Sequence, residues 1–281
     1  MTDLETKEMM NAMQDDKAGV KDKNLFLLDS KKELDQRLIR FLPPLAKKGE
    51  KVFYHKHFTH WIDNQKHQCC NSVLVDADGN VHEPQRCPIC EYVSKLYKTS
   101  DRGSEEWRLA GALRRRERFL SRIVDRESDE PTRVLFFEYG PTIYEMLYNY
   151  IINSEFGNIV DPKKGRDYKI VKKGVQRNAS YSASSPSLKE SPLFEDATQL
   201  KECLKNASEM DYNSMIKYES PAELKRALDE YLGNYDEPAE KPAISSKPAP
   251  TPFESFENST EEKSTSVETD EIDDILNEFT T

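Results

Sequence analysis

The segment Cys87-Pro88-Ile89-Cys90 constrains the fold of this chain more than any other feature. A C-x-x-C turn delivers two thiolates to one side of a metal ion, and tetrahedral zinc needs two further nitrogen or sulfur ligands. Residues able to supply them lie just upstream, and they are Cys69, Cys70, His60, His67 and His82. We therefore expect either a binding module stabilised by a metal ion or a redox-active dithiol.

The surroundings of the C-x-x-C pair favour the metal site over redox chemistry. Thioredoxin-like motifs follow a strand within a βαβ unit, whereas here Pro84-Gln85-Arg86 precedes the pair and no βαβ pattern surrounds it. A zinc deaminase needs His-x-Glu and then Pro-Cys-x-x-Cys, but His82-Glu83 is adjacent and Arg86 replaces the proline. The odd number of five cysteines also suits metal ligation in a reducing compartment better than disulfides.

The other metal ligands are expected from a β-hairpin over residues 52–70. The first half of this segment alternates like a strand, and a turn around Asn64-Gln65 returns the chain toward the cysteine pair. If the turn takes two residues, His60 lies opposite Cys69, and if it takes three, Cys70 lies there instead. The pattern leaves the two cysteines as alternatives.

Three histidines are not expected to bind the metal. We predict them to be exposed residues of strands, and they are His55, His57 and His82.

Short strand patterns alternate with helical patterns along the rest of the chain. Strands are predicted over 37–42, 52–62, 119–124, 133–139 and 168–175, and helices over 91–97, 105–118, 143–152, 196–209 and 221–232. Cys203 lies in one of these helices and is expected to be a small core residue. Such an order, mainly β with α, suits a small barrel with insertions, which is common among oligonucleotide-binding (OB) folds.

The acidity of the chain is concentrated at its C-terminal end. The formal net charge is −10, and residues 234–281 carry 13 acidic and 3 basic side chains, so the rest of the chain balances to zero. We therefore expect a disordered acidic tail over 234–281 and a polar, weakly structured arm over 1–22. No apolar run approaches the length of about 18 residues that a membrane-spanning helix needs, so we expect no membrane partner.

Basic residues cluster within the neutral part of the chain, and aromatic residues are interleaved with them. Residues 108–126 contain seven arginines against two acids, and residues 162–177 contain seven basic residues against one acid. A strongly self-repelling cluster such as Arg114-Arg115-Arg116, with Arg118 and Arg122, indicates an anionic partner. Cations that follow a backbone and rings that stack on unpaired bases are what single-strand binding needs.

Motifs typical of catalysis are missing from the sequence. It contains no glycine-rich phosphate loop, no G-x-S-x-G and no H-E-x-x-H. We therefore do not expect an enzyme. Two alternatives remain, a zinc-containing accessory subunit of a nucleic-acid enzyme such as a nuclease, and a zinc-ribbon transcription regulator.

Several segments together resemble one known family. They are Ile39 to Pro43, the hairpin from His60 to the cysteines, Cys87 to Lys95, Val134 to Tyr144 and Asp270 to Asn277. In this order the chain resembles the helix-destabilising, single-stranded DNA-binding protein of T-even-like tailed phages, over about residues 25–232 and the tail. The C-P-I-C-x-Y segment and the acidic tail are the most specific parts.

The resemblance implies a domain organisation and a set of partners. It implies an OB-fold core over 23–233 that binds single-stranded DNA, with an inserted zinc subdomain at about 52–97. The arm, 1–22, would serve self-association along DNA. The tail, 234–281, would contact phage replication proteins such as the polymerase, the helicase loader and recombination mediators. The protein would act in DNA replication, recombination and repair in the cytoplasm of the infected bacterial host.

The resemblance also implies site residues, which are carried over by position. One Zn²⁺ per chain would be held by His60, Cys87, Cys90 and one of Cys69 and Cys70. The DNA-binding groove would include Tyr97, Trp107, Arg114, Arg115, Arg116, Phe119, Phe137 and Tyr181.

Overall fold

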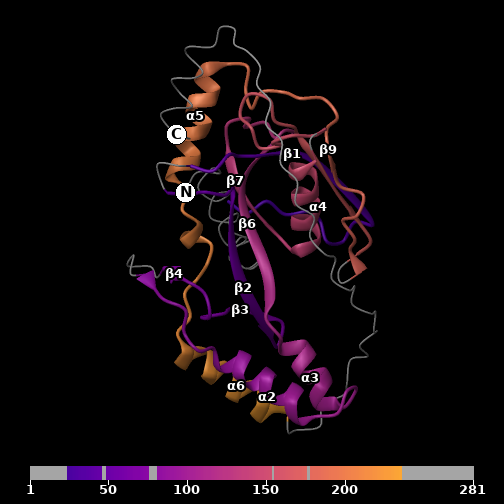
Figure 1. The fold of residues 1–281 in the computed structure, drawn as a ribbon, viewed down its shortest axis with the longest axis vertical. Helices are drawn as coiled ribbons and strands as arrows, with labels where there is room; N and C mark the ends of the chain where they lie inside the picture. Colours follow the sequence, from indigo (N-terminus) through magenta and orange to yellow (C-terminus); the bar gives the residue numbers. More distant parts are fainter. Residues whose placement is uncertain (1–23, 46–48, 76–80, 154, 176–177, 236–281) are drawn as a thin grey trace, which may run out of the picture.

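The computed structural model describes residues 24–45, 49–75, 81–153, 155–175 and 178–235. The arm predicted over 1–22 lies outside these described residues, as do residues 236–281 of the predicted tail. Within the described part, an antiparallel sheet and five α-helices make a mixed α/β fold that is elongated along one axis (Figure 1).

The main sheet has the strand order β3-β2-β6-β1-β8-β9, and β7 pairs with β6 beside this path. Its strands are β1 (Leu34–Phe41), β2 (Tyr54–Ile62), β3 (Gln65–Gln68), β6 (Arg116–Asp125), β7 (Val134–Tyr139), β8 (Tyr168–Lys173) and β9 (Ser185–Pro186). A separate pair of short strands consists of β4 (Leu74–Val75) and β5 (Val81–His82).

Strand β6 connects the two ends of the molecule. Along one edge, its first half pairs with β2 and its last residues pair with β1, while β7 pairs along its other edge. The β2–β3 hairpin therefore extends toward one end of the molecule, and β1, β8 and β9 build the other end (Figure 1).

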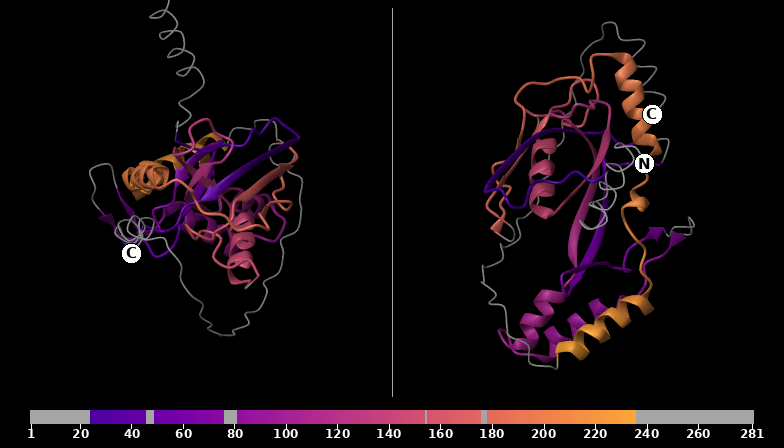
Figure 2. Two further views of the ribbon diagram at one scale, coloured as in Figure 1. Left: turned by 90° about the horizontal axis from the view of Figure 1, so that it is seen from above. Right: turned by 180° about the vertical axis from the view of Figure 1, so that it is seen from behind.

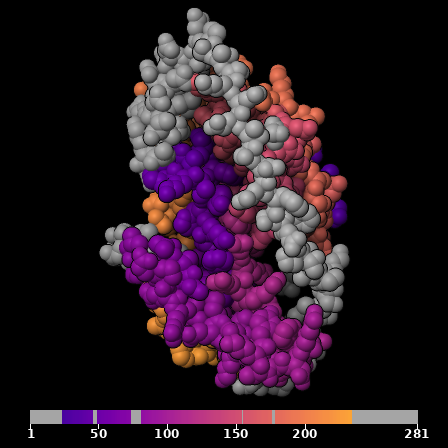
Figure 3. All heavy atoms as spheres, in the orientation of Figure 1, coloured from indigo at the N-terminus to yellow at the C-terminus, as the bar shows by residue number. Residues whose placement is uncertain are grey.

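Three helices surround the tip of the hairpin. They are α2 (Pro88–Thr99), α3 (Glu105–Leu113) and α6 (Pro221–Tyr235). Local signals start the first two, because Pro88 occupies the first turn of α2 and the Ser104 hydroxyl accepts the Trp107 N–H at the start of α3. Their apolar faces share one core with the hairpin, and α2 and α3 form a distinct end of the surface (Figure 3).

Two further helices cover opposite faces of β6 and β7. Helix α4 (Pro141–Ile152) packs on the face that carries Phe119 and Ile123, and α5 (Ala197–Glu209) packs on the face that carries Val124 (Figure 2). Cys203 on α5 is buried in the second of these cores, which confirms its prediction as a core residue. No helix in the described residues is both long enough and apolar enough to cross a membrane.

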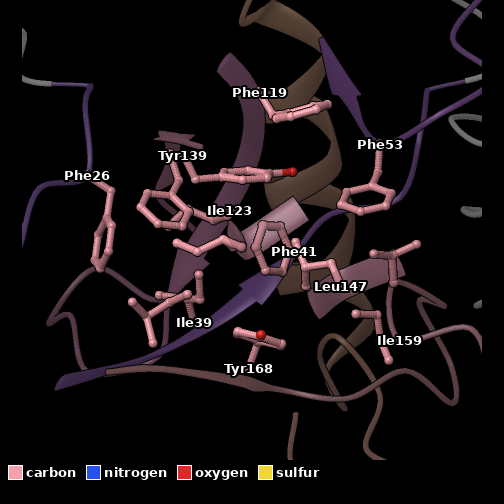
Figure 4. Close-up of a cluster of buried hydrophobic side chains, with 14 residues drawn as sticks. Phe26, Ile39, Phe41, Phe53, Phe119, Ile123, Tyr139, Leu147, Ile159 and Tyr168 are labelled. Atoms are coloured by element: carbon pink, nitrogen blue, oxygen red, sulfur yellow. The ribbon is translucent and has the colours of Figure 1, made fainter. Parts of the chain in front are cut away.

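The larger core is dominated by aromatic rings. Phe41 lies between Tyr139 and Tyr168, with ring centroids 6.0 Å and 5.7 Å away in edge-on arrangements (Figure 4). Edge-to-face pairs of this kind stabilise a core beyond the area that they bury. This core holds β1, β6, β7 and β8 together, and β6 in turn pairs with β2 of the hairpin.

The helix predicted over 105–118 is wrong in its last five residues, 114–118. Helix α3 ends at Leu113, Arg114 adopts ψ 144°, and Arg116 already pairs with Thr59 as the first residue of β6. Four arginines within five residues would repel one another on a helix, whereas a strand separates successive side chains onto opposite faces. The basic cluster therefore lies at a helix-to-strand junction.

Candidate metal centre and nucleic-acid interface

The structure brings four of the predicted ligands together at the tip of the hairpin. His60 lies on β2, Cys69 follows β3, Cys87 caps the start of α2, and Cys90 lies in the first turn of that helix. One ligand atom from each lies within 4.8 Å of all the others. Segments distant in the sequence thus converge on one point that a metal ion could hold.

The distances within this cluster fit a tetrahedral metal ion. Cys69 Sγ lies 3.7 Å from Cys90 Sγ, and the Cys87 and Cys90 sulfurs each lie 3.5 Å from His60 Nε2. Zinc bonds of about 2.3 Å to sulfur and about 2.0 Å to nitrogen, at tetrahedral angles, separate sulfurs by about 3.8 Å and sulfur from nitrogen by about 3.5 Å. The donor set of three thiols and one imidazole is typical of a closed structural zinc site.

The orientation of His60 is fixed by a partner outside the cluster. Its buried ring places Nδ1 2.8 Å from the carbonyl oxygen of Leu113, the last residue of α3. A carbonyl accepts only, so Nδ1 carries the hydrogen and donates it, which leaves the Nε2 lone pair for a metal. This bond also ties the end of α3, and thus the basic cluster that follows it, to the metal centre.

The charges of the site favour a cation at its centre. Burial would lower the pKa of His60, but hydrogen bonds to Cys69 and Cys87 outweigh burial and raise it to about 9, so a metal ion that binds Nε2 would displace a proton from it. The pKa of Cys87 is lowered because Cys69, Cys90 and His60 all hydrogen-bond to its sulfur. The same kind of contacts, with Cys69 and Cys87, raise the pKa of Cys90, so the metal-free site holds one thiolate, and a bound soft divalent ion would displace the remaining thiol protons.

The structure distinguishes between the two alternative cysteines. Cys69 belongs to the four-residue cluster and Cys70 does not. Burial, followed by the nearby charges of Cys87 and Cys69, raises the pKa of Cys70 to about 12, so it stays a neutral thiol beside the site. Cys69 is therefore the ligand that this geometry supports.

The turn of the hairpin lies one residue earlier than predicted. Asp63 and Asn64 form it with φ of 47° and 61°, which pairs His60 with His67 rather than with Cys69. Two consecutive positive φ values are typical of a type I′ turn, which Asn and Asp tolerate better than most residues. Cys69 reaches the cluster because its N–H still donates to the Phe58 carbonyl of β2 at 2.9 Å, in register with the ladder, so its side chain lies on the same face as that of His60.

The prediction of three exposed histidines is also wrong. His57 is buried, with Nδ1 3.1 Å from the Gln68 side-chain oxygen and Nε2 3.4 Å from a Glu138 oxygen. His55 and His82 are partly buried, and they stack on tyrosine rings at 5.6 Å and 3.9 Å. All three rings pack against neighbouring segments, which strand periodicity alone does not reveal.

The three consecutive arginines are exposed at the α3–β6 junction, beside the metal centre. Arg115 lies over the Phe58 ring with its guanidinium carbon 4.5 Å from the centroid. Lys56, two residues before Phe58 on β2, places Nζ 5.6 Å from the same ring and 5.9 Å from the Phe119 ring, and it also pairs with the Glu117 carboxylate on β6. Cations and rings thus share one surface of β2 and β6.

Rings continue this surface onto α4. Tyr144 stacks on Phe119 with centroids 4.1 Å apart and planes 2° apart, and Tyr148 follows at 6.4 Å and 22°. Sequence reasoning did not include Tyr144 and Tyr148, although their spacing of four residues places both on one face of a helix. We call the set Arg115, Phe58, Lys56, Phe119, Tyr144 and Tyr148 the aromatic–cationic strip.

Two of the predicted DNA-binding rings are core residues in the structure. Phe119 is 1% exposed and Phe137 is 5% exposed, and both belong to the larger core. Other core residues already cover the Phe137 ring, so it is not accessible for direct stacking of a base. Phe119 takes part in the strip only as the support beneath Tyr144.

The other predicted residues have mixed surroundings. Tyr97 and Trp107 are partly exposed and pack on each other at 4.6 Å between α2 and α3, and Tyr181 is partly buried against the larger core. Arg122 is not an exposed cation, because it is 3% exposed and pairs with Glu50 at 2.8 Å. The cationic surface is therefore smaller than the sequence cluster indicated.

Comparison with known proteins adds one result to this geometry. A family model described as gp32 DNA binding protein like matches residues 35–230, which is more than half of the chain. No curated protein matches the sequence. The matched range contains the four clustered ligands and the whole aromatic–cationic strip.

Proposed function

The chain belongs to the family of gp32-like DNA-binding proteins, and we propose that it coats single-stranded DNA with little sequence preference during phage DNA replication, recombination and repair. The observation that carries this proposal is the aromatic–cationic strip. Cations follow the phosphate backbone, and exposed rings stack on bases at about 1–3 kcal/mol each, whatever the base. Phosphate contacts and ring stacking do not depend on the base, so the proposed binding tolerates any sequence.

We further propose that the metal is zinc and that its role is structural. All four ligands come from the protein, which leaves no open position for a reacting water. Bound zinc would lock the hairpin to α2, and the His60–Leu113 hydrogen bond would extend that order to the end of α3. Arg114 to Arg116 begin at that point, so the metal would fix the cations that meet DNA.

The wider organisation is also proposed from the sequence. The core over 23–233 would be an OB fold with the metal-holding part inserted. The arm would support self-association along DNA, and the acidic tail would recruit replication proteins. The protein would have no catalytic activity and would act in the cytoplasm of the infected bacterial host.

The test of DNA binding is a titration of tryptophan fluorescence with poly(dT) at several salt concentrations. Trp61 lies on β2 and Trp107 on α3, both at the metal-holding end of the molecule, so their fluorescence should report on binding there. Arg115→Ala should weaken binding to every sequence and lower the salt slope by about 0.7, the contribution of one phosphate contact to single-stranded DNA. Arg133→Ala is the matched control, since Arg133 is exposed but pairs with Glu130 away from the strip.

Two results would overturn the proposal. One is a parent protein that binds duplex and single-stranded DNA equally. The other is an Arg115 variant that keeps the parent's salt slope, which would mean that the strip does not contact phosphate.

A further inference from the structure

A cavity of about 340 Å³ opens at the α4 end of the aromatic–cationic strip. Its walls are mostly apolar, and they are formed by Pro44, Lys51, Val52, Phe53, Tyr54, Tyr144, Leu147, Tyr148, Ile151, Asn158 and Val160. Ligand pockets in proteins begin at about 300 Å³, so this volume suits one small planar group rather than a folded segment.

The cavity is continuous with the strip through shared side chains. Tyr144 stacks on Phe119 of the strip and also lines the cavity, where its hydroxyl lies 3.3 Å from that of Tyr54. Tyr148, the last ring of the strip, is 53% exposed at the cavity wall. A strand that follows the strip therefore arrives at this opening.

The side chains that line the cavity determine which kind of ligand it can bind. Lys51 is the one charged side chain among the described lining residues, and it is exposed. Asn158 accepts the Val160 N–H at 3.3 Å with its side-chain oxygen, which leaves its NH₂ as a donor. Apolar walls, tyrosine rings, one cation and one amide donor match a planar heterocycle that carries acceptors and is joined to an anion.

We propose that this cavity takes one nucleobase of the bound strand, turned out of the stacked run, while Lys51 meets the adjoining phosphate. The inference rests on the proposed function and names a subsite for it. The base lies against Tyr148 and the aliphatic wall of Leu147 and Val160. All four bases carry carbonyl or ring-nitrogen acceptors for the Asn158 donor, so the subsite is tolerant of sequence.

The occupied cavity would set the register of the strand on the protein. Stacking along an open surface lets a strand slide, whereas a base held inside a cavity must leave it before the strand can move. The subsite therefore contributes more to the lifetime of the complex than to the rate of its formation.

The test uses the full chain and the shortest oligo(dT) that binds with full affinity, so that one register dominates. A single abasic nucleotide is placed at each position in turn. One position should lose about tenfold in affinity with the parent, the value of one lost stacked base. In Tyr148→Ala the intact oligonucleotide should bind about tenfold more weakly, and the penalty at that position should disappear.

Matched variants keep the test independent of folding. Tyr148→Phe retains the ring and should behave like the parent. Leu188→Ala removes a side chain that is 85% exposed and does not line the cavity, so it controls for unspecific loss. An oligonucleotide with 5-iodouracil at the sensitive position should crosslink within 141–160 on irradiation.

The outcomes separate this inference from the proposed function. If the parent binds oligo(dT) but Tyr148→Ala keeps the full abasic penalty, and crosslinks fall only near β2 and β6, the base subsite is wrong and the strip stands. If Tyr148→Ala alters only the binding of a protein partner, the cavity holds an apolar side chain instead. If the parent does not bind oligo(dT), the proposed function itself fails.

Discussion

Glu138 connects three strands at the buried side of the hairpin. Its carboxylate lies 3.4 Å from His57 Nε2 on β2 and 2.7 Å from Lys66 Nζ on β3, while Glu138 itself belongs to β7. Burial would raise its pKa, but the hydrogen bonds and charges of His57 and Lys66 outweigh burial and lower it to about 2. The ionised carboxylate therefore stabilises the folded state.

This shift predicts acid sensitivity of the fold. Between about pH 4.5 and pH 2, Glu138 takes up a proton in the unfolded chain but stays ionised in the folded chain. The free energy of unfolding therefore falls by about 3 kcal/mol as the pH is lowered through this range. Glu138→Gln should remove that part of the dependence and lower stability at pH 7. Urea unfolding of both proteins from pH 7 to pH 3 measures the part of it above pH 3, about 2 kcal/mol. Acid release of the metal affects both proteins equally, and parallel curves would contradict the prediction.

The two neighbouring cysteines should differ in their effect on the metal. Cys69→Ser removes a ligand of the cluster and should lower the zinc content well below one ion per chain, together with the thermal stability. Cys70→Ser, the matched control one residue away, should keep the metal. Atomic absorption after dialysis measures the content. Retention of zinc by the Cys69 variant and loss by the Cys70 variant would reverse the assignment.

At the level of elements, the β2–β3 turn determines which residues meet at the metal centre. Asn64 has φ 61°, a conformation that Asn and Gly tolerate and β-branched residues do not. Asn64→Val should cost about 1–3 kcal/mol and loosen the hairpin, which would weaken metal retention although no ligand is changed. Asn64→Gly should be close to neutral. Urea unfolding with and without a chelator tests both variants, and equal behaviour of the two would argue against the turn.

Helices and strands that bury one clear apolar face could be predicted from the sequence. The helices predicted over 143–152 and 196–209 match α4 and α5, and the strand over 133–139 matches β7, because each has one clear apolar face. The end of α3 and the position of the hairpin turn could not be predicted in this way. Both depend on which strand forms backbone hydrogen bonds with these residues, and the periodicity of the sequence does not contain that information.

The residues of the candidate site also divide into those that the sequence predicts and those that only the fold determines. The C-x-x-C pair and His60 could be predicted, since ligand chemistry and spacing are local properties. The choice of Cys69 depended on a register that one residue can shift. The sequence does not show whether a phenylalanine ring is exposed, and it is the fold that covers Phe119 with Tyr144 of α4 and Phe137 with Phe26 and Phe41. Tyr148 was missed because aromatic residues at helical spacing usually face a core.

For the whole molecule, the metal centre and the strip are mechanically connected. The metal ligands hold the hairpin and α2, the His60–Leu113 bond holds α3, and β6 continues from that point through the larger core to β1. Removal of the metal should therefore affect DNA binding as well as stability. The cations of the strip, rather than its deeply buried rings, should lose their positions first.

The last prediction concerns the acidic tail, most of which lies outside the described residues. Residues 254–281 carry ten acids against Lys263, and Ile272, Ile275, Leu276 and Phe279 have helical spacing. We expect this charge to compete with DNA for the cations of the strip, and the apolar face to engage a replication partner. Deletion of 254–281 should tighten single-strand binding severalfold at low salt, little at high salt, and abolish partner capture.

A matched control separates charge from length in this prediction. A tail of unchanged length, with its ten acids replaced by Asn and Gln, should reproduce the tighter DNA binding, because competition for the strip depends on charge. Fluorescence titration with poly(dT) at two salt concentrations measures it. If both variants bind like the parent at low salt, the tail does not occupy the strip. If the deleted protein still captures replication proteins, recruitment uses another surface.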